Sequence, residues 1–201
     1  LRIFYNGRTG QPSAQQLQPV VDNSNPLNIT TGNPNLKQQF IHTFRILYNS
    51  FDVVTQKIFF ATINANFTDN DIQNSTTYLP NGAQFTRPVN LSGTYNINGF
   101  LNYGFPLKKP KSNINLGVNL SNSQSQTLVN NLSNYTRNTT AGFNASWTTN
   151  IKEGFDMNFS SNSSFSFARY TLQPQQNGDF FTQTFVAEPT IYTKSGWVFS
   201  T

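Results

Sequence analysis

The chain has 201 residues, of which 36% are hydrophobic and 10% are charged, whereas a soluble domain usually carries about a quarter charged residues. Its net charge of +5 comes from scattered basic residues rather than from a patch with stacking aromatics, so no nucleic-acid partner is indicated. The lack of cysteine excludes a disulfide framework and cysteine metal sites. Asn, Ser, Thr and Gln replace the missing charges, and the 14% aromatic content argues against disorder.

The N-terminal segment predicts the end of a strand followed by a long loop. Residues 1–6 have strand character, and residues 7–36 are rich in Gly, Pro, Asn and Gln. The four prolines of this loop are incompatible with a continuous strand ladder. Long loops are usually functional or disordered. The prolines are Pro12, Pro19, Pro26 and Pro34.

Two alternating segments follow, at residues 40–49 and 59–68, and a short turn near residues 50–56 joins them. The second segment is the clearer one, because one parity is apolar and the other is polar apart from Phe60. A loop over residues 73–84 comes next, with a Pro-Asn-Gly turn signal at its end.

The strand with the most regular pattern runs from Val89 to Phe105. Its odd positions are apolar apart from two glycines, and its even positions carry amides, hydroxyls or glycine apart from Phe100. Because successive side chains of a strand point to opposite faces, one face is apolar and the other is wet. Globular strands usually have about 5–6 residues, whereas a tilted strand needs about 9–11 to cross a bilayer.

The C-terminal half repeats this alternation in hairpins. Strands are predicted at residues 114–121, 141–148, 155–167, 180–193 and 197–201. Short turns are predicted near residues 50–56, 106–111, 151–154 and 194–196, and longer connections at residues 7–36, 73–84, 122–131 and 172–179. Outer-membrane barrels have this asymmetry, with short periplasmic turns and longer extracellular loops.

The sequence therefore predicts an all-β protein, an antiparallel up-and-down transmembrane β-barrel of which residues 1–201 supply a single segment of about nine strands. Lysines and aromatic residues gather near the short turns, as in an interfacial girdle, although turns also attract lysine for other reasons. The predicted lipid-facing residues are Leu91, Tyr95, Ile97, Leu101, Tyr103, Phe105, Leu116, Val118, Phe143, Trp147 and Phe159. The predicted lumen-facing amides are Asn90, Asn96, Asn98, Asn102, Asn115, Asn119, Asn144 and Asn158.

These lumen amides have two interpretations, either hydrogen bonding to each other, to a plug and to water, or lining a substrate path. The chain has no run of about 20 apolar residues that would form a transmembrane helix. It also lacks a signal peptide pattern at residues 1–5. We therefore expect it to be a fragment of a longer polypeptide.

The long loop carries a resemblance to a family. Its pieces are Gln11-Pro12-Ser13, Gln16-Leu17-Gln18-Pro19, Asp22-Asn23-Ser24-Asn25-Pro26 and Thr31-Gly32-Asn33-Pro34-Asn35-Leu36-Lys37. They resemble the loop-and-strand junction of Bacteroidetes outer-membrane barrels of the TonB-dependent receptor type. The piece from Gly32 to Lys37 is the most specific, and the resemblance places Gly32, Asn33, Pro34 and Asn35 in an extracellular loop.

This resemblance implies a large barrel that surrounds an N-terminal plug and imports bulky nutrients in the outer membrane of a Gram-negative bacterium. The implied partners are outer-membrane lipid, the protein's own plug and the TonB complex, with a surface lipoprotein or an envelope complex as a further partner. The plug is not among these residues. Two alternatives stay open, namely a non-transporting barrel with a structural or assembly role, and a soluble adhesin or β-solenoid rich in Asn and Thr.

Catalytic and metal sites are poorly supported by the sequence. His42 is the single histidine, and no G-x-S-x-G element accompanies it, so we expect no enzyme. Asp69 and Asp71 share a parity near a loop and suggest either a calcium site or, more simply, a solvated strand end. Asn-x-Ser/Thr sequons are frequent, as chance predicts in such a composition. No cofactor is expected.

Overall fold

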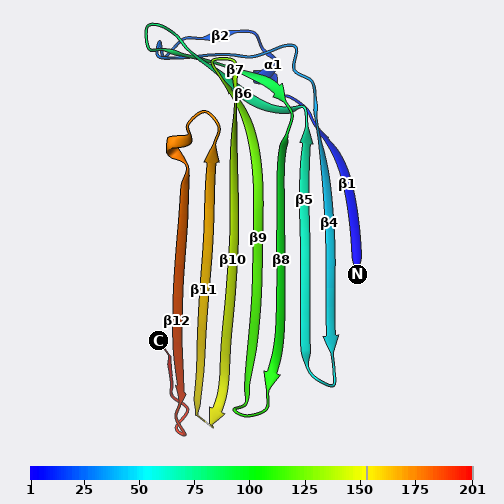
Figure 1. The fold of residues 1–201 in the computed structure, drawn as a ribbon, viewed down its shortest axis with the longest axis vertical. Coiled ribbons are helices and arrows are strands. Elements are labelled where there is room, and N and C mark those ends of the chain that lie inside the picture. Colours follow the sequence, from blue (N-terminus) through cyan, green and yellow to red (C-terminus); the bar gives the residue numbers. More distant parts are fainter. Residues whose placement is uncertain (153, 201) are drawn as a thin grey trace.

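The computed structural model describes residues 1–152 and 154–200, most of which form one tall antiparallel sheet (Figure 1). In the described residues, the main sheet has the order β1-β4-β5-β8-β9-β10-β11-β12-β13, so neighbouring strands follow one another along the chain. These strands are β1 (Arg2–Gly10), β4 (Gln39–Asp52), β5 (Lys57–Asp69), β8 (Thr94–Leu107), β9 (Ser112–Val129), β10 (Leu132–Lys152), β11 (Phe155–Tyr170), β12 (Gly178–Tyr192) and β13 (Val198–Ser200).

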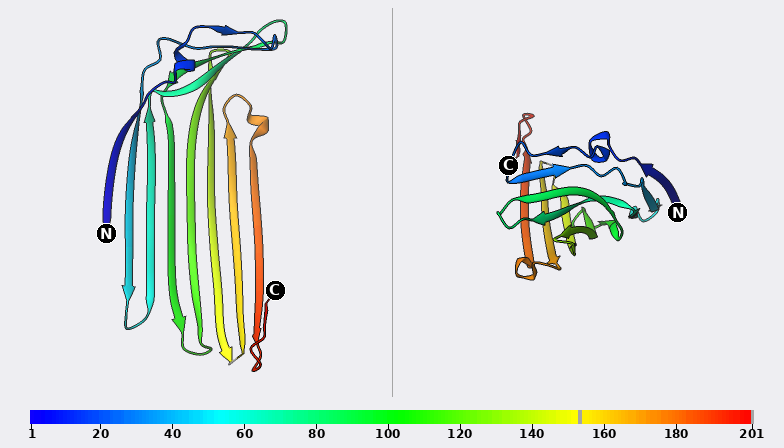
Figure 2. Two further views of the ribbon diagram at one scale, coloured as in Figure 1. Left: turned by 180° about the vertical axis from the view of Figure 1, so that it is seen from behind. Right: turned by 90° about the horizontal axis from the view of Figure 1, so that it is seen from above.

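The remaining elements form a second layer at one end of the sheet, which we call the upper layer (Figures 1 and 2). The hairpin of β6 and β7 pairs in parallel with the end of β9 through β6, and in parallel with β3 through β7. The upper layer consists of α1 (Ala14–Leu17), β2 (Val21–Asp22), β3 (Asn28–Thr31), β6 (Asp71–Tyr78) and β7 (Gln84–Leu91). A single 3-10 turn, η1 (Pro174–Gln176), lies between β11 and β12.

The predicted up-and-down, antiparallel, all-β organisation is confirmed. The sheet is open in the described residues, with β1 at one edge and β12 with the short β13 at the other. Ala83 is the one fully buried hydrophobic residue among those described, so the sheet has almost no internal core. Its apolar side chains need a medium outside the chain to cover them.

The predicted continuous strand from Val89 to Phe105 is wrong, because the chain breaks at Ser92 and Gly93. Residues up to Leu91 belong to β7 in the upper layer, and β8 starts at Thr94. Gly93 has a φ of +98°, a conformation that glycine adopts without a Cβ penalty. The alternation continued across the break because β7 is itself a strand of the same parity.

Three predicted loops also contain regular structure. Residues 7–36 hold the end of β1 together with α1, β2 and β3, and residues 73–84 lie mostly in the β6–β7 hairpin. Residues 122–131 were expected to form a polar loop, but β9 continues to Val129 and β10 begins at Leu132. The turn between them is Asn130-Asn131, with φ values of 50° and 62°. Paired positive φ values are typical of a two-residue hairpin turn.

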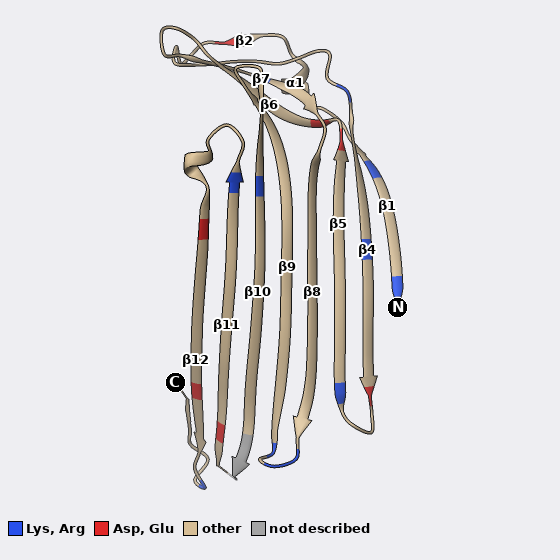
Figure 3. Ribbon diagram, in the orientation of Figure 1, with Lys and Arg blue, Asp and Glu red and all other residues tan. Residues whose placement is uncertain are grey.

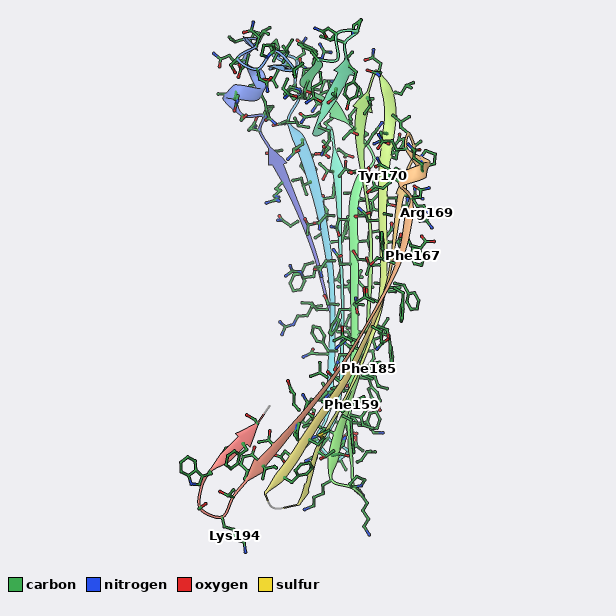
Figure 4. The ribbon with its side chains drawn as sticks, turned by 90° about the vertical axis from the view of Figure 1, so that its left-hand side faces the viewer. Phe159, Phe167, Arg169, Tyr170, Phe185 and Lys194 are labelled. Carbon is green, nitrogen blue, oxygen red and sulfur yellow. The ribbon has the colours of Figure 1, made fainter. Side chains whose placement is uncertain are left out.

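The predicted asymmetry between the two ends of the sheet holds only in part, because the β9–β10 connection at the end with the upper layer is the two-residue turn Asn130-Asn131 (Figure 1). At the end opposite the upper layer, which we call the lower end, short turns lie at residues 53–56 and 108–111. Figure 3 shows that from β5 to β11 the charged residues lie near the ends of the strands. Figure 4 shows the sheet from the side, bowed, with the upper layer on the side toward which it curves. Phe167 lies toward the opposite, convex side.

Candidate functional site: two faces of the sheet and the upper layer

One face of the sheet, which we call the apolar face, carries aliphatic and aromatic side chains. Directly paired residues of an antiparallel sheet share a face, and the register aligns Leu101 with Val118 and Val118 with Phe143. The same register brings ten of the eleven predicted lipid-facing residues onto this face. They are Tyr95, Ile97, Leu101, Tyr103, Phe105, Leu116, Val118, Phe143, Trp147 and Phe159.

Aromatic residues border this apolar face at both ends. Toward the lower end, the ring centroids of Tyr103 and Phe105 are 5.4 Å apart, and Trp147 pairs with Phe159 across β10 and β11. Toward the upper layer, Phe67 and Tyr95 have centroids 6.4 Å apart. On β8 the stretch from Tyr95 to Phe105, which includes both borders, has 11 residues and so matches the roughly 9–11 residues of a membrane-crossing strand.

The other face, which we call the polar face, carries amides and hydroxyls. It holds seven of the eight predicted lumen-facing amides, namely Asn96, Asn98, Asn102, Asn115, Asn119, Asn144 and Asn158. Two of these amides bond to side chains of the neighbouring strand: Ser121 Oγ donates to Asn98 Oδ1 at 2.8 Å, and Asn158 Nδ2 donates to Glu188 Oε2 at 2.9 Å. These two bonds agree with the first interpretation, in which the amides bond to other groups of the chain.

Three of these asparagines lie over glycines of the neighbouring strand. Asn115 pairs with Gly104, and its Oδ1 lies 2.6 Å from where a Cβ of residue 104 would stand. Asn144 covers Gly117, and Asn119 covers Gly142, both within overlap distance of such a Cβ. The glycines therefore make room for the amides.

Asn90 and Leu91 do not lie in the main sheet, because they belong to β7. Asn90 is a connector in the upper layer: its Oδ1 accepts from the backbone N–H of Lys37 at 2.7 Å. Its Nδ2 donates to the carbonyl oxygens of Lys37 at 2.9 Å and Asn70 at 2.7 Å. Asn90 thus ties the entry of β4 to the link between β5 and β6.

Gly32 of the predicted extracellular loop packs against the backbone of the α1 segment. Its N–H donates to the carbonyl of Gln18 at 3.1 Å. A Cβ at this position would lie 2.8 Å from the carbonyl oxygens of Gln15 and Gln16, and closer still to that of Gln18. Real Cβ atoms do not approach backbone oxygens this closely, so the position requires glycine.

Asn33 joins three segments of the upper layer. Its backbone N–H donates to the carbonyl of Gln16 at 2.6 Å, and its Nδ2 donates to the carbonyl of Pro88 in β7 at 3.0 Å. Its Oδ1 accepts from the N–H of Asn35 at 3.0 Å, which turns the chain at Pro34. The α1 segment is fixed in turn by a capping box between Ser13 and Gln16.

A hollow of about 370 Å³ lies inside the upper layer and is lined mainly by neutral polar groups. Its lining includes Gln15, Gln18, Thr30, Thr86 and Asn74. Asp22 is the carboxylate of this lining. The hydroxyl and the N–H of Ser24 both donate to Asp22 Oδ1, at 2.7 and 3.0 Å, and these bonds lower the pKa of the carboxyl.

Asp69 and Asp71, the two carboxylates considered for a calcium site, form hydrogen bonds with different partners. Asp69 Oδ2 lies 3.2 Å from His42 Nε2, and His42 Nδ1 lies 3.0 Å from the Tyr5 hydroxyl. Asp71 Oδ2 instead accepts from Gln73 Nε2 at 2.8 Å and from Thr94 Oγ1 at 2.7 Å. Among the described residues, no group of three or more His, Cys, Asp or Glu is placed to hold a metal ion.

Sequence reasoning missed one pair of basic residues, Arg137 and Arg169, which the register places directly opposite each other on the apolar face. The signal was present, since Arg137 lies 14 residues before the predicted turn at residues 151–154 and Arg169 lies 15 residues after it. The two arginines are far apart in the sequence, so the basic residues were interpreted as scattered.

No helix in the described part of the chain has the length and apolar character to cross a membrane. A search of curated proteins and a search of solved structures both returned no match. Residues 1–193 match the outer membrane protein beta-barrel family. This match covers nearly the whole chain and agrees with its antiparallel, two-faced sheet. The chain therefore belongs to the outer membrane protein beta-barrel family, and its location is the outer membrane.

Proposed function

We propose that this chain forms part of the wall of a TonB-dependent-type receptor that imports a bulky nutrient. The observation that carries the proposal is the combination of a wide polar face with a folded layer at one end of it. In a barrel the apolar face would contact lipid and the polar face would line the lumen. The upper layer, with its Gly32-Asn33-Pro34-Asn35 loop, would stand on the extracellular side and capture the ligand.

The sheet curves gently and stays open, which supports a large barrel. Barrel diameter grows roughly in proportion to strand number, and about eight strands leave an interior only wide enough for side chains. Here the nine described strands of the main sheet still leave two separate edges at β1 and β12–β13. Unpaired edges invite pairing with further strands. We infer that further strands complete the wall and leave space for a plug.

A non-transporting barrel is the second candidate, and the Asn–Gly pairs favour it. Asn144 over Gly117 and Asn119 over Gly142 use the amides of the polar face for contacts within the sheet. An amide that packs on the neighbouring strand projects less far toward a substrate in the lumen. Such a barrel would serve as a structural or assembly partner in the envelope.

Two measurements on the protein extracted from its native membrane separate these functions. The first is its intact mass, because an importer with a plug and a complete barrel must be several times larger than the 22.6 kDa of this chain. The second is binding of the purified periplasmic domain of TonB. A large mass with TonB binding supports the importer. A mass near 22.6 kDa, or a large protein that does not bind TonB, contradicts it and supports the non-transporting barrel.

A further inference from the structure

Arg137 on β10 and Arg169 on β11 are directly opposed residues of the apolar face. Like charges directly opposite each other destabilise a pair of strands. The surrounding carboxylates compensate only in part, because Asp179 is the one carboxylate bonded to this pair among the described residues. The local excess of positive charge is a property expected of an anion site.

The hydrogen bonds of the two guanidinium groups leave donors for a ligand. Arg169 uses Nη1 for Asp179 Oδ1 at 2.5 Å and for the carbonyls of Ala168 and Gly178 at 3.0 and 3.2 Å. Arg137 uses Nη2 for Gln124 Oε1 at 2.7 Å. A guanidinium has five N–H donors in a planar fork, so each arginine keeps N–H groups beyond those of the nitrogen used in these bonds.

These side chains line a hollow of about 480 Å³. Its other lining residues are Gln124, Tyr135, Tyr170 and Thr171. The Thr171 hydroxyl donates to the Tyr135 carbonyl, and Gln124 Nε2 donates one of its two N–H groups to the Gly93 carbonyl, so the phenols of Tyr135 and Tyr170 and the second N–H of Gln124 are the lining groups that can donate to an oxyanion. Arginine forks match the paired oxygens of a phosphate group.

The position of the hollow on the sheet indicates which kind of phosphate group could reach it. The register places Arg137 and Arg169 in the row of Tyr95, at the upper aromatic border of the apolar face, and the guanidinium carbon of Arg169 lies 5.8 Å from the ring centroid of Phe167. Figure 4 shows Arg169 beyond Phe167, toward the upper end of β11. Headgroups of the outer leaflet lie at this height if the apolar face contacts lipid.

We propose that Arg137 and Arg169 bind the phosphate of an outer-leaflet glycolipid. This inference rests on the proposed orientation of the barrel, with the upper layer outside and the apolar face in lipid. The lipid chains would lie along the aliphatic and aromatic side chains below the hollow, and the phosphate would bridge the two guanidinium groups. The site would have a structural role, because it would anchor the barrel to phosphorylated glycolipids of the outer leaflet.

The test uses the full-length protein in detergent and native mass spectrometry with three probes: bisphosphorylated lipid A, the same lipid with both phosphates removed, and inorganic phosphate. We expect wild-type protein to bind the bisphosphorylated lipid and to bind the dephosphorylated lipid at least about tenfold more weakly, since charge-assisted hydrogen bonds dominate the contact. The R137Q/R169Q variant should lose this preference. The R2Q/R45Q variant removes the same charge from the polar face and should keep it.

Equal binding of the two lipids by wild-type protein would overturn the proposal, as would loss of the preference in R2Q/R45Q. Displacement of the lipid by an equimolar amount of inorganic phosphate would also overturn it, because the site would then be one for free phosphate. Quenching of a fluorophore at residue 101 by brominated lipid chains tests the orientation separately. If residue 101 is quenched and the lipids are not distinguished, only the phosphate site fails; if residue 101 is not quenched, the barrel orientation fails.

Discussion

The amide of Asn144 lies over Gly117 on the polar face, in the space that a side chain of residue 117 would occupy. The pair links β9 with β10, and Asn119 and Gly142 repeat the arrangement in reverse two positions along the hairpin. In the first pair the amide is on β10 and the glycine on β9, and in the second pair the amide is on β9 and the glycine on β10. Close packing across β9 and β10 is thus obtained without large side chains.

Gly117→Ala tests this packing. The new methyl group must displace the Asn144 amide, and overpacking of this kind costs about 1–3 kcal/mol. Urea unfolding of the full-length protein in detergent should therefore show a lower midpoint. Gly99→Ala is the matched control, because the nearest atom to its new Cβ is a carbonyl oxygen 4.0 Å away. Equal losses in both variants would contradict the packing role of Asn144.

Leu101→Arg and Asn102→Arg test the two faces of β8. Leu101 belongs to the apolar face and Asn102 to the polar face, so the same charge enters two different environments. An arginine on the lipid side near the bilayer midplane costs roughly 2–4 kcal/mol, whereas an arginine in the lumen is much milder. Folding yield into lipid vesicles measures the difference. Similar yields for the two variants would refute the assignment of faces.

Asn33→Ala should loosen the upper layer. The change removes the bond from Asn33 Nδ2 to the Pro88 carbonyl and the acceptor for the N–H of Asn35. Each lost bond is worth about 1 kcal/mol. We expect faster hydrogen exchange in residues 14–18 and 84–91, with the main sheet unchanged. Asn35→Ala serves as the control, since Asn35 contributes its backbone N–H rather than its side chain. Identical exchange in the two variants would argue against the Asn33 side chain as a link between segments of the upper layer.

Acid should release the turn at Asp22. Bonds from the hydroxyl and N–H of Ser24 hold the pKa of the Asp22 carboxyl below its ordinary value of 3.8. A depressed pKa stabilises the folded turn above the ordinary value, and this contribution disappears as the pH falls through the lower folded value. Carboxyl carbon shifts in a pH titration should show Asp22 protonating below pH 3.8. In Ser24→Ala its pKa should rise toward the ordinary value, and an unchanged pKa would exclude Ser24 as the cause.

The main sheet was predictable because its pairing is local. Each long strand pairs with its neighbour in the chain, so the period-2 pattern of Ile97 to Phe105 divides these residues between the two faces of the sheet in the same way as the observed register. The same rule could have paired Arg137 with Arg169. It failed for Asn119 and Gly142, since residues 122–131 were interpreted as a loop and the true turn is two residues long.

The upper layer was not predictable in this way. Its pairings join segments far apart in the chain, such as Asn28 with Gln84 and Ser75 with Leu128. Alternation identifies a strand but says nothing of a distant parallel partner. The break at Gly93 could not be predicted either. The apolar positions of β7 and β8 have the same parity, and a glycine can also occur within one continuous alternating strand.

The parallel pairing of β6 with the tip of β9 sets an order for biogenesis. The antiparallel hairpins can be added one after another as the chain enters the membrane, since each needs only its predecessor. In the β6–β7 hairpin, β7 can pair with β3, which precedes it, but β6 has no partner outside the hairpin until residues 128 and 129 have arrived. Closing such long segments delays their contacts. The contact between β6 and β9 therefore completes the upper layer last, and pulse-labelled hydrogen exchange during refolding would show protection in β9 before β6.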